Sequence, residues 1–366
     1  MKLMHQTMVP RHEKSPRAWG IGAGVRVAVL AGSVLVLSAG LQGMGVAAEK
    51  PVPVLPPTDD DFPYQGEYAG VLRDVTGRPN WTGLQVVAQG KGEFFALEIP
   101  GGLPGSGGRP TQQTNLVGWR KKSQLQLAGN DRQITVELNE AIVRDGRGRE
   151  LGRLRKYLRT SHSLGQKPPS GAIVLFDGAD VDHLTNASVT PDRLLNVGAD
   201  TRESYGDFRL HVEFRTPYMP SARGQSRGNS GIYIQGRYEV QILDSFGLEG
   251  LNNECGSLYK THAPSTNMCL PPMAWQSYDI DFVAARFNAS GEKAAPAQIT
   301  VRHNGVVVQD RYEIPDKTGA GAAEGPDARP IRFQNHNDAV NFRNVWIVPG
   351  TPSGESKAPP RHVTMR

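Results

Sequence analysis

A pair of short strand-forming segments joined by a turn, residues 228–245, constrains the fold of this chain more than any other feature. The stretch reads GNSGIYIQGRYEVQILDS, with the turn at Gly236 and Arg237. Side chains alternate between the two faces of a strand. One face therefore carries Ile232, Ile234, Val240 and Ile242, and the other carries Tyr233, Gln235, Glu239 and Gln241. We predict a hairpin whose apolar face enters a core and whose second face suits sugar binding, because that face presents an acid, two amides and a phenol.

The rest of the second half of the chain shows the same strand-like pattern of apolar residues. Alternating or short apolar runs, bounded by turn residues, occupy residues 172–178, 208–215, 278–282, 299–308, 331–334 and 340–348. Asn304 and Gly305 form the strongest short-range signal for a hairpin turn. No segment of this half has the period of an amphipathic helix. We therefore predict an all-β fold with two sheets packed face to face and one concave polar face.

A separate run of short strands precedes this half. It comprises residues 66–72, 84–89, 93–99, 116–120, 124–128 and 134–138, separated by glycine and proline. Strands at this spacing predict a small sandwich or barrel. Because the region holds no cluster of acids or histidines, we expect a structural or docking domain.

The first 48 residues have the layout of a secretory signal peptide. A basic leader is followed by an apolar run, Val27 to Leu37, and by small residues that end at Ala48. An uncleaved membrane anchor over about residues 25–46 is the alternative. Residues 1–48 hold five Lys or Arg and one Glu, so the net charge of +5 leaves the rest of the chain near +1. The basic isoelectric point is therefore no sign of a nucleic-acid partner.

These observations divide the chain into six parts. They are a signal peptide (1–48), a Pro-rich spacer (49–61), a small β domain (62–155), a linker (156–170), a β-sandwich (171–350) and a tail (351–366). We expect an exported protein, periplasmic, cell-surface or secreted, with no membrane association once the signal is removed.

The chain has two cysteines, Cys255 and Cys269. In an exported protein an even number suggests a disulfide, which here would close a short loop and stabilise the fold by about 3 kcal/mol on the chain-entropy model. A pair of free thiols is the alternative. Neither cysteine belongs to a C-x-x-C pair, so a zinc site is not expected.

Six short motifs in the second half occur in a characteristic order. They are LFDG at 175–178, GNSG at 228–231, YEVQILDS at 238–245, HNG at 303–305, QNH at 334–336 and FRNVWI at 342–347. Together they resemble the 3-keto-disaccharide hydrolase domain family over about residues 172–348. The resemblance implies a concanavalin A-like jelly-roll β-sandwich. The first region is similar to a small β domain found ahead of this one in exported proteins.

The family resemblance also implies a reaction. In its substrates the glucose unit carries a ketone at C3, which acidifies the hydrogen on C2. A base removes that hydrogen, the enolate expels the oxygen at C1, and water adds to the unsaturated sugar. This route needs a base near neutrality and a group that holds the enolate oxygen.

Polar residues in and between the motifs are the candidates for this chemistry. The catalytic candidates are Glu239, His336 and Asp244, and the substrate-binding candidates are Asn229, Tyr233, Gln241, Tyr259, Gln334 and Arg343. Glu239 and His336 suit a base, an acid or the ligands of a divalent metal, but no closed ligand-spacing motif identifies a metal. Asp244 has the opposite parity to Glu239, so capping of the following turn is an equal alternative for it.

Two other functions stay open. A conventional β-glucanase needs two carboxyl groups about 5 Å apart, yet Glu239 is followed at the next outward position by the amide Gln241. A glycan-binding, lectin-like module of the same fold needs no catalyst. In each case the expected partner is an oligosaccharide or a glycoside.

Overall fold

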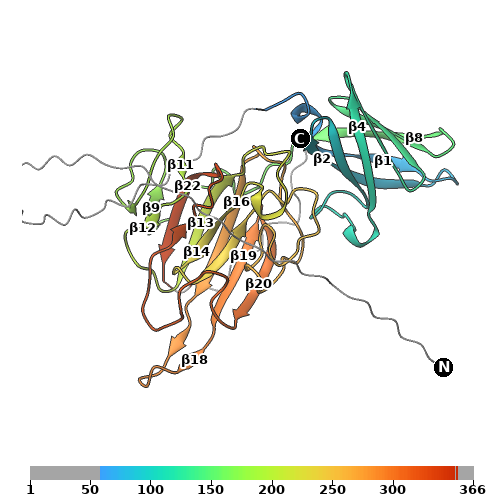
Figure 1. The fold of residues 1–366 in the computed structure, drawn as a ribbon. Helices are drawn as coiled ribbons and strands as arrows, with labels where there is room; N and C mark the ends of the chain where they lie inside the picture. Colours follow the sequence, from blue (N-terminus) through green and yellow to red (C-terminus); the bar gives the residue numbers. More distant parts are fainter. Residues whose placement is uncertain (1–57, 351, 353–366) are drawn as a thin grey trace, which may run out of the picture. The chain divides into compact units, whose positions relative to one another are not determined.

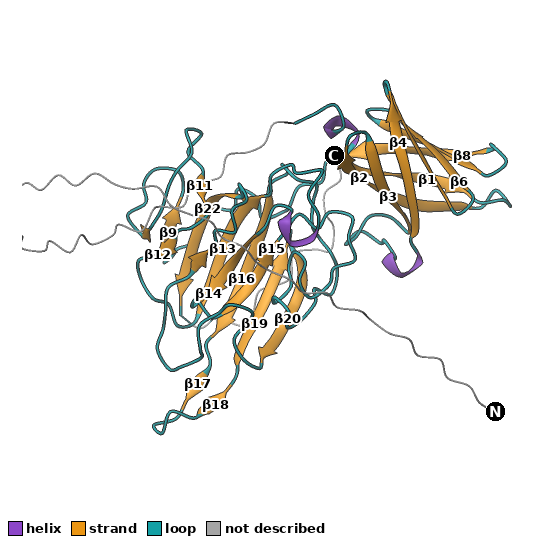
Figure 2. Cartoon of the chain, in the orientation of Figure 1, coloured by secondary structure: helices purple, strands orange, loops and turns teal. Residues whose placement is uncertain are grey.

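The computed structural model describes residues 58–350 and residue 352. The predicted signal peptide lies outside the described residues, as does nearly all of the predicted tail. Figure 2 shows an all-β chain, as predicted, in which the described helices are short 3-10 turns: η1 (Phe62–Tyr64), η2 (Pro110–Gln112) and η3 (Gly224–Ser226). Within these residues, no helix has the length and apolar character needed to cross a membrane. The described residues belong to one compact unit.

The first region is a closed antiparallel barrel of eight strands, coloured blue to green in Figure 1. They are β1 (Gly66–Arg73), β2 (Pro79–Gly90), β3 (Glu93–Pro100), β4 (Thr114–Lys121), β5 (Gln124–Gly129), β6 (Arg132–Val136), β7 (Glu140–Asp145) and β8 (Glu150–Tyr157). The sequence pattern missed β7 and β8, because their outward positions carry charges such as Arg144 and Arg153. Their inward residues, Val143 and Leu154 among them, are fully buried in the barrel core. Without these two strands the sheet could not close.

The second region contains two larger sheets and a small hairpin. The five-stranded sheet has the order β10 (Leu184–Thr185), β12 (Asp200–Thr201), β21 (Arg332–Phe333), β14 (Ser230–Ile234), β15 (Tyr238–Ile242). The seven-stranded sheet has the order β11 (Leu195–Asn196), β22 (Asn341–Pro349), β13 (Phe208–Arg215), β16 (Gln276–Val283), β19 (Ala297–His303), β20 (Val306–Ile314), and β9 (Ile173–Phe176) also pairs with β22. The hairpin joins β17 (Arg286–Phe287) to β18 (Lys293–Ala295).

The hairpin of β14 and β15 has the facing predicted from the sequence. Ile232 pairs with Val240, and both lie in one core cluster with Val212 and Phe282 of the seven-stranded sheet. Burying a side chain of this size stabilises the fold by about 1.5–3 kcal/mol. A one-residue slip in register would bring these side chains to the opposite face. The core therefore holds the polar face of the hairpin in place.

Candidate functional site

Glu239 occupies the centre of the polar face of the hairpin. It lies on β15 directly opposite Tyr233 of β14 and is only 2% exposed. Its carboxylate lies over Gly231, where an added Cβ atom would come within 2.5 Å of Oε1. The glycine therefore provides the space that the carboxylate occupies.

The surroundings of Glu239 raise its affinity for a proton. Burial raises its pKa from 4.5 to about 7, and a hydrogen bond from Tyr233 partly offsets this effect. Burial also raises the pKa of Tyr233, and the charge of Glu239 adds to that shift, so the phenol remains a donor. Among the described residues, no second carboxylate contributes to the pKa shift of Glu239. A lone carboxylate that titrates near neutrality has the properties of a general base.

Two amides continue the polar face beside Glu239. One end of the Gln241 side chain lies 3.2 Å from Glu239 Oε1 and 2.8 Å from the carbonyl oxygen of Ser230, so its nitrogen occupies that end and donates to both. The other end lies 3.0 Å from the side chain of Gln225. Asn229 Nδ2 in turn donates to the carbonyl oxygen of Gln225 at 2.7 Å. The predicted binding residues Asn229, Tyr233 and Gln241 are thus gathered around one carboxylate.

Two segments far away in the sequence enclose Glu239. The Thr318 hydroxyl accepts a hydrogen bond from the backbone N–H of Glu239 at 2.6 Å. The backbone N–H of Tyr259 donates to the carbonyl oxygen of Glu239 at 3.1 Å. A Cβ atom at Gly319 would lie 2.8 Å from the Tyr259 ring and 3.6 Å from Glu239 Oε2. Tyr259 and the loop around Thr318 therefore form the walls of the site.

His336 lies at the edge of this polar face and is exposed. Burial raises the pKa of Asp338, and the nearby His336 partly offsets this effect. Asp338 Oδ2 accepts a hydrogen bond from the backbone N–H of Asn229 at 2.7 Å. Gln334 is closer to the hairpin, because its backbone N–H donates to the carbonyl oxygen of Gly231 at 2.9 Å. Within the described residues no hydrogen bond or ion pair joins His336 to Glu239.

The structure places Asp244 apart from this cluster. Its Oδ2 forms a buried ion pair with Arg227 Nε at 2.7 Å. Its Oδ1 accepts a hydrogen bond from the backbone N–H of Phe246 at 3.3 Å, which is the turn-capping contact that the sequence offered as an alternative.

Arg343 lies on the other sheet. It belongs to β22, where its Nε donates to Glu213 Oε2 at 2.7 Å, and its guanidinium lies over the ring of Trp275 at 4.0 Å. The seven-stranded sheet therefore holds Arg343, whereas Glu239 belongs to the five-stranded sheet.

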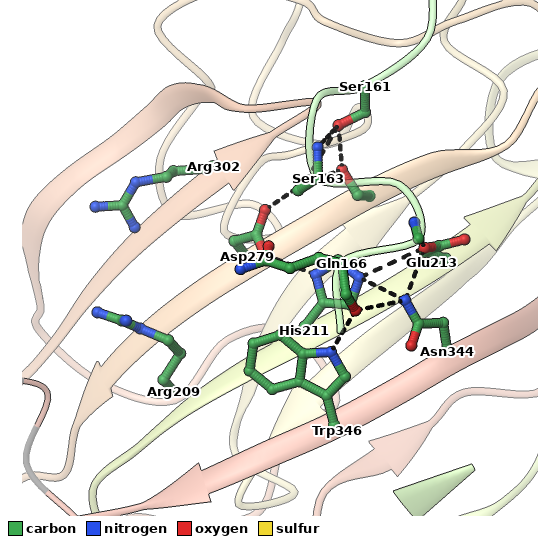
Figure 3. Close-up of polar contacts among 12 residues, drawn as sticks. Ser161, Ser163, Gln166, Arg209, His211, Glu213, Asp279, Arg302, Asn344 and Trp346 are labelled. Carbon is green, nitrogen blue, oxygen red and sulfur yellow. Dashed lines mark hydrogen bonds and ion pairs between the residues drawn. The ribbon is translucent and has the colours of Figure 1, made fainter. Parts of the chain in front are cut away.

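A second cluster of ionisable groups lies on the seven-stranded sheet, with His211 at its centre (Figure 3). His211 Nδ1 lies 2.7 Å from Asp279 Oδ1, Nε2 lies 3.7 Å from Glu213 Oε1, and the ring stacks on Trp346 with 5.0 Å between centroids. Burial disfavours the charged imidazole, but the hydrogen bonds to the two carboxylates outweigh it and raise the pKa of His211 to about 9. The imidazole is therefore a cation at neutral pH.

Residues 161–166, within the predicted linker, cover this second cluster. Ser161 and Ser277 share a hydroxyl–hydroxyl hydrogen bond of 2.6 Å, and Ser163 donates to Asp279 Oδ2 at 2.7 Å. The backbone N–H of Gly165 donates to Glu213. The ionic cluster thus anchors this segment to the sheet (Figure 3).

The disulfide expected from the sequence is not confirmed. Both cysteines are buried free thiols in contact with each other. Cys255 Sγ also lies 3.2 Å from the hydroxyl of Tyr278, and that hydroxyl donates to the carbonyl oxygen of Gln241 at 2.6 Å. The thiols therefore pack beneath the strand that carries Glu239.

The strand patterns did not identify several residues of this site. Gln225, Thr318 and Asp338 stand outside the strand patterns, and Thr318 lies in a loop rich in glycine and alanine. The one available signal was Gly231, which leaves the position opposite Gln241 without a side chain. No group of three or more His, Cys, Asp or Glu suited to a metal ion occurs in the described part of the chain.

Comparison with known proteins gives one family and several solved structures. Residues 171–348 match the profile of a family described as the 3-keto-alpha-glucoside-1,2-lyase-like domain. The chain is also similar to three candidate glycosyl hydrolases of Parabacteroides distasonis ATCC 8503. The first is 35% identical with a TM-score of 0.47, and the match covers 50% of this chain and 85% of that one. The second is 18% identical (TM-score 0.37; 49% and 94% covered), and the third is 21% identical (TM-score 0.35; 48% and 98% covered). No curated protein matches the chain.

Proposed function

Residues 171–348 belong to the 3-keto-alpha-glucoside-1,2-lyase-like domain family, and on this premise we propose that the protein is a carbohydrate-active enzyme that cleaves 3-keto-glycosides. This is the family that the ordered sequence motifs resemble. We further propose that the two large sheets form a concanavalin A-like jelly-roll sandwich, and that the protein is exported.

The observation that supports this reaction best is the isolated Glu239. Its pKa of about 7 suits removal of the C2 proton next to a ketone. Among the residues that the structure describes, no second carboxylate acts on it as the double displacement of a retaining glycosidase would require. In the proposed reaction Glu239 takes the C2 proton, and the electron pair of that C–H bond forms the enolate. The enolate then expels the C1 oxygen, which receives a proton, and water adds to the unsaturated sugar.

The remaining residues have supporting roles in this proposal. Tyr233 and Gln241 hold the Glu239 carboxylate, while Asn229, Gln334 and Tyr259 offer polar and aromatic contacts to a sugar. His336, exposed at the edge of the same face, is the candidate acid for the leaving oxygen. Asp244 and Arg343 already have charged partners, and we assign them structural roles.

Incubation of the purified protein with a 3-keto-glucoside and with its unoxidised parent tests the reaction. We expect release of the aglycone from the 3-keto-glucoside alone, detected by chromatography. Glu239→Gln and His336→Ala should abolish release. The matched controls Glu249→Gln and His183→Ala, at exposed positions outside the site, should leave it unchanged. Cleavage of the parent alone would refute the elimination mechanism, and normal turnover by Glu239→Gln would refute the assignment of the base.

A glycan-binding module without catalysis is the second candidate. It is favoured by the enclosure of Glu239, which is 2% exposed, and by the lack of contact between Glu239 and His336. This alternative predicts that the protein binds glycosides but cleaves neither member of the test pair. Calorimetric titration with the same two compounds distinguishes it from the enzyme.

A further inference from the structure

A cavity of about 600 Å³ lies apart from Glu239, which is not among its lining residues. Strands β3 and β4 of the barrel form one wall, through Phe95, Val117 and Trp119. The segments around Arg223 and Phe246 form the other. This volume lies within the range of small-molecule sites, which are mostly apolar with few polar groups.

The walls of this cavity expose large apolar side chains. Trp119 is 57% exposed, Val117 is 55% exposed and Leu248 is 39% exposed. Large aromatic and aliphatic surfaces gain free energy when a ligand removes them from water. The indole of Trp119 on one wall and the aliphatic side chain of Leu248 on the other suit a flat apolar group.

The charged groups that line the cavity are Arg223, Arg227, Asp244 and the exposed Glu93, whose charge acts on Arg223. Arg227 is paired with Asp244 at 2.7 Å. Arg223 donates to the carbonyl oxygens of Gln89 at 2.9 Å, Pro220 at 2.6 Å and Ala222 at 2.8 Å. Because both cations have partners, the cavity offers no unpaired cation for an anionic ligand. Its chemistry favours a neutral, apolar occupant.

One short segment connects the cavity to the Glu239 cluster. Gly224 lines the cavity, and the next residue, Gln225, contacts Asn229 and Gln241. Gln241 in turn donates to Glu239. Residues 224–225 therefore lie between the cavity and the Glu239 cluster.

We propose that this cavity binds the planar apolar group of an aryl glycoside, so that the barrel contributes to recognition of the leaving group. The identification of that group as an aglycone rests on the proposed function. The existence of an apolar site does not. The inference gives the barrel a role that the sandwich alone could not supply, because Trp119 and Val117 are barrel residues.

The test compares phenyl and methyl 1-thio-β-D-glucoside, which differ only in the group on sulfur and resist hydrolysis. Isothermal titration calorimetry on the full protein should show that the phenyl compound binds about tenfold more tightly, as stacking on an indole and burial of the ring imply. Trp119→Ala should remove this preference, and Leu248→Ala should reduce it from the other wall. Trp81→Ala, at a barrel tryptophan that is 36% exposed and outside the cavity, should retain it.

Equal affinity for the two compounds, or a phenyl preference that survives Trp119→Ala, would overturn the proposal. Trp119 is more than half exposed, so its truncation should not unfold the barrel, and circular dichroism verifies this. A phenyl preference in a protein that cleaves no 3-keto-glucoside would refute the proposed function but retain the apolar site. Cleavage of a 3-keto-glucoside without a phenyl preference would support the proposed function but refute the apolar site.

Discussion

The buried imidazole of His211 should make the stability of the protein fall in alkaline solution. Its cation lies between Asp279 and Glu213, and Arg343 contacts Glu213 from the other side. Because folding raises the pKa of His211 from 6.5 to about 9, its contribution to stability is complete below pH 6.5 and is lost as the pH rises through 9. The whole contribution corresponds to about 3 kcal/mol.

Glu213 has the opposite dependence. Burial opposes its charge, but hydrogen bonds from His211, Asn344 and Gly165 outweigh it and lower the pKa from 4.5 to about 2. Its contribution is complete above pH 4.5 and is lost as the pH falls through 2. The cluster should therefore stabilise the fold most between pH 4.5 and 6.5.

Urea unfolding of the wild type and of His211→Gln between pH 6 and pH 10 measures this effect. The variant should be less stable at pH 6, and the difference in the free energy of unfolding should shrink by about 3 kcal/mol by pH 10. His303→Gln is the control: burial lowers the pKa of folded His303 to about 3, so only its unfolded form titrates in this range, and the difference should change by less than about 1 kcal/mol. A difference between wild type and His211→Gln that stays constant with pH would refute the reasoning.

Three further predictions concern Glu239 and Asp244. The kcat/KM for a 3-keto-glucoside should fall about tenfold per pH unit as the pH drops below about 7, because Glu239 must lose its proton to act as base; a rate that stays constant on this acid side would exclude this role. Gly231→Ala should displace the Glu239 carboxylate and lower kcat by about 10²-fold with little change in melting temperature; unchanged kinetics would show that the position of the carboxylate is uncritical. Asp244→Ala should leave Arg227 buried without its partner and destabilise the fold by about 3–5 kcal/mol in chemical unfolding; a loss below 1 kcal/mol would mean that the ion pair is dispensable.

The local sequence pattern was enough to predict the all-β class and the two faces of the β14–β15 hairpin. A strand has a period of two, so the alternation of Ile232 and Ile234 with Tyr233 shows which side chains share the apolar face before any partner is known. The same pattern failed for β7 and β8, where long charged side chains hide the inward positions. Barrel closure, which makes those strands necessary, is not a local property.

The arrangement of the candidate site depended on tertiary structure. The sequence identified Glu239 and His336 as polar residues of two motifs, but only the packing of distant segments showed that Thr318 and Tyr259 enclose Glu239 while His336 is exposed at the edge. The pKa of Glu239 has the same origin, because burial is its largest cause. Burial is set by loops far away in the chain, and no periodicity in the strand itself records them. The sequence by itself thus determined which side chains share a face, and the tertiary structure decided which of them are removed from water and so which could act as a base.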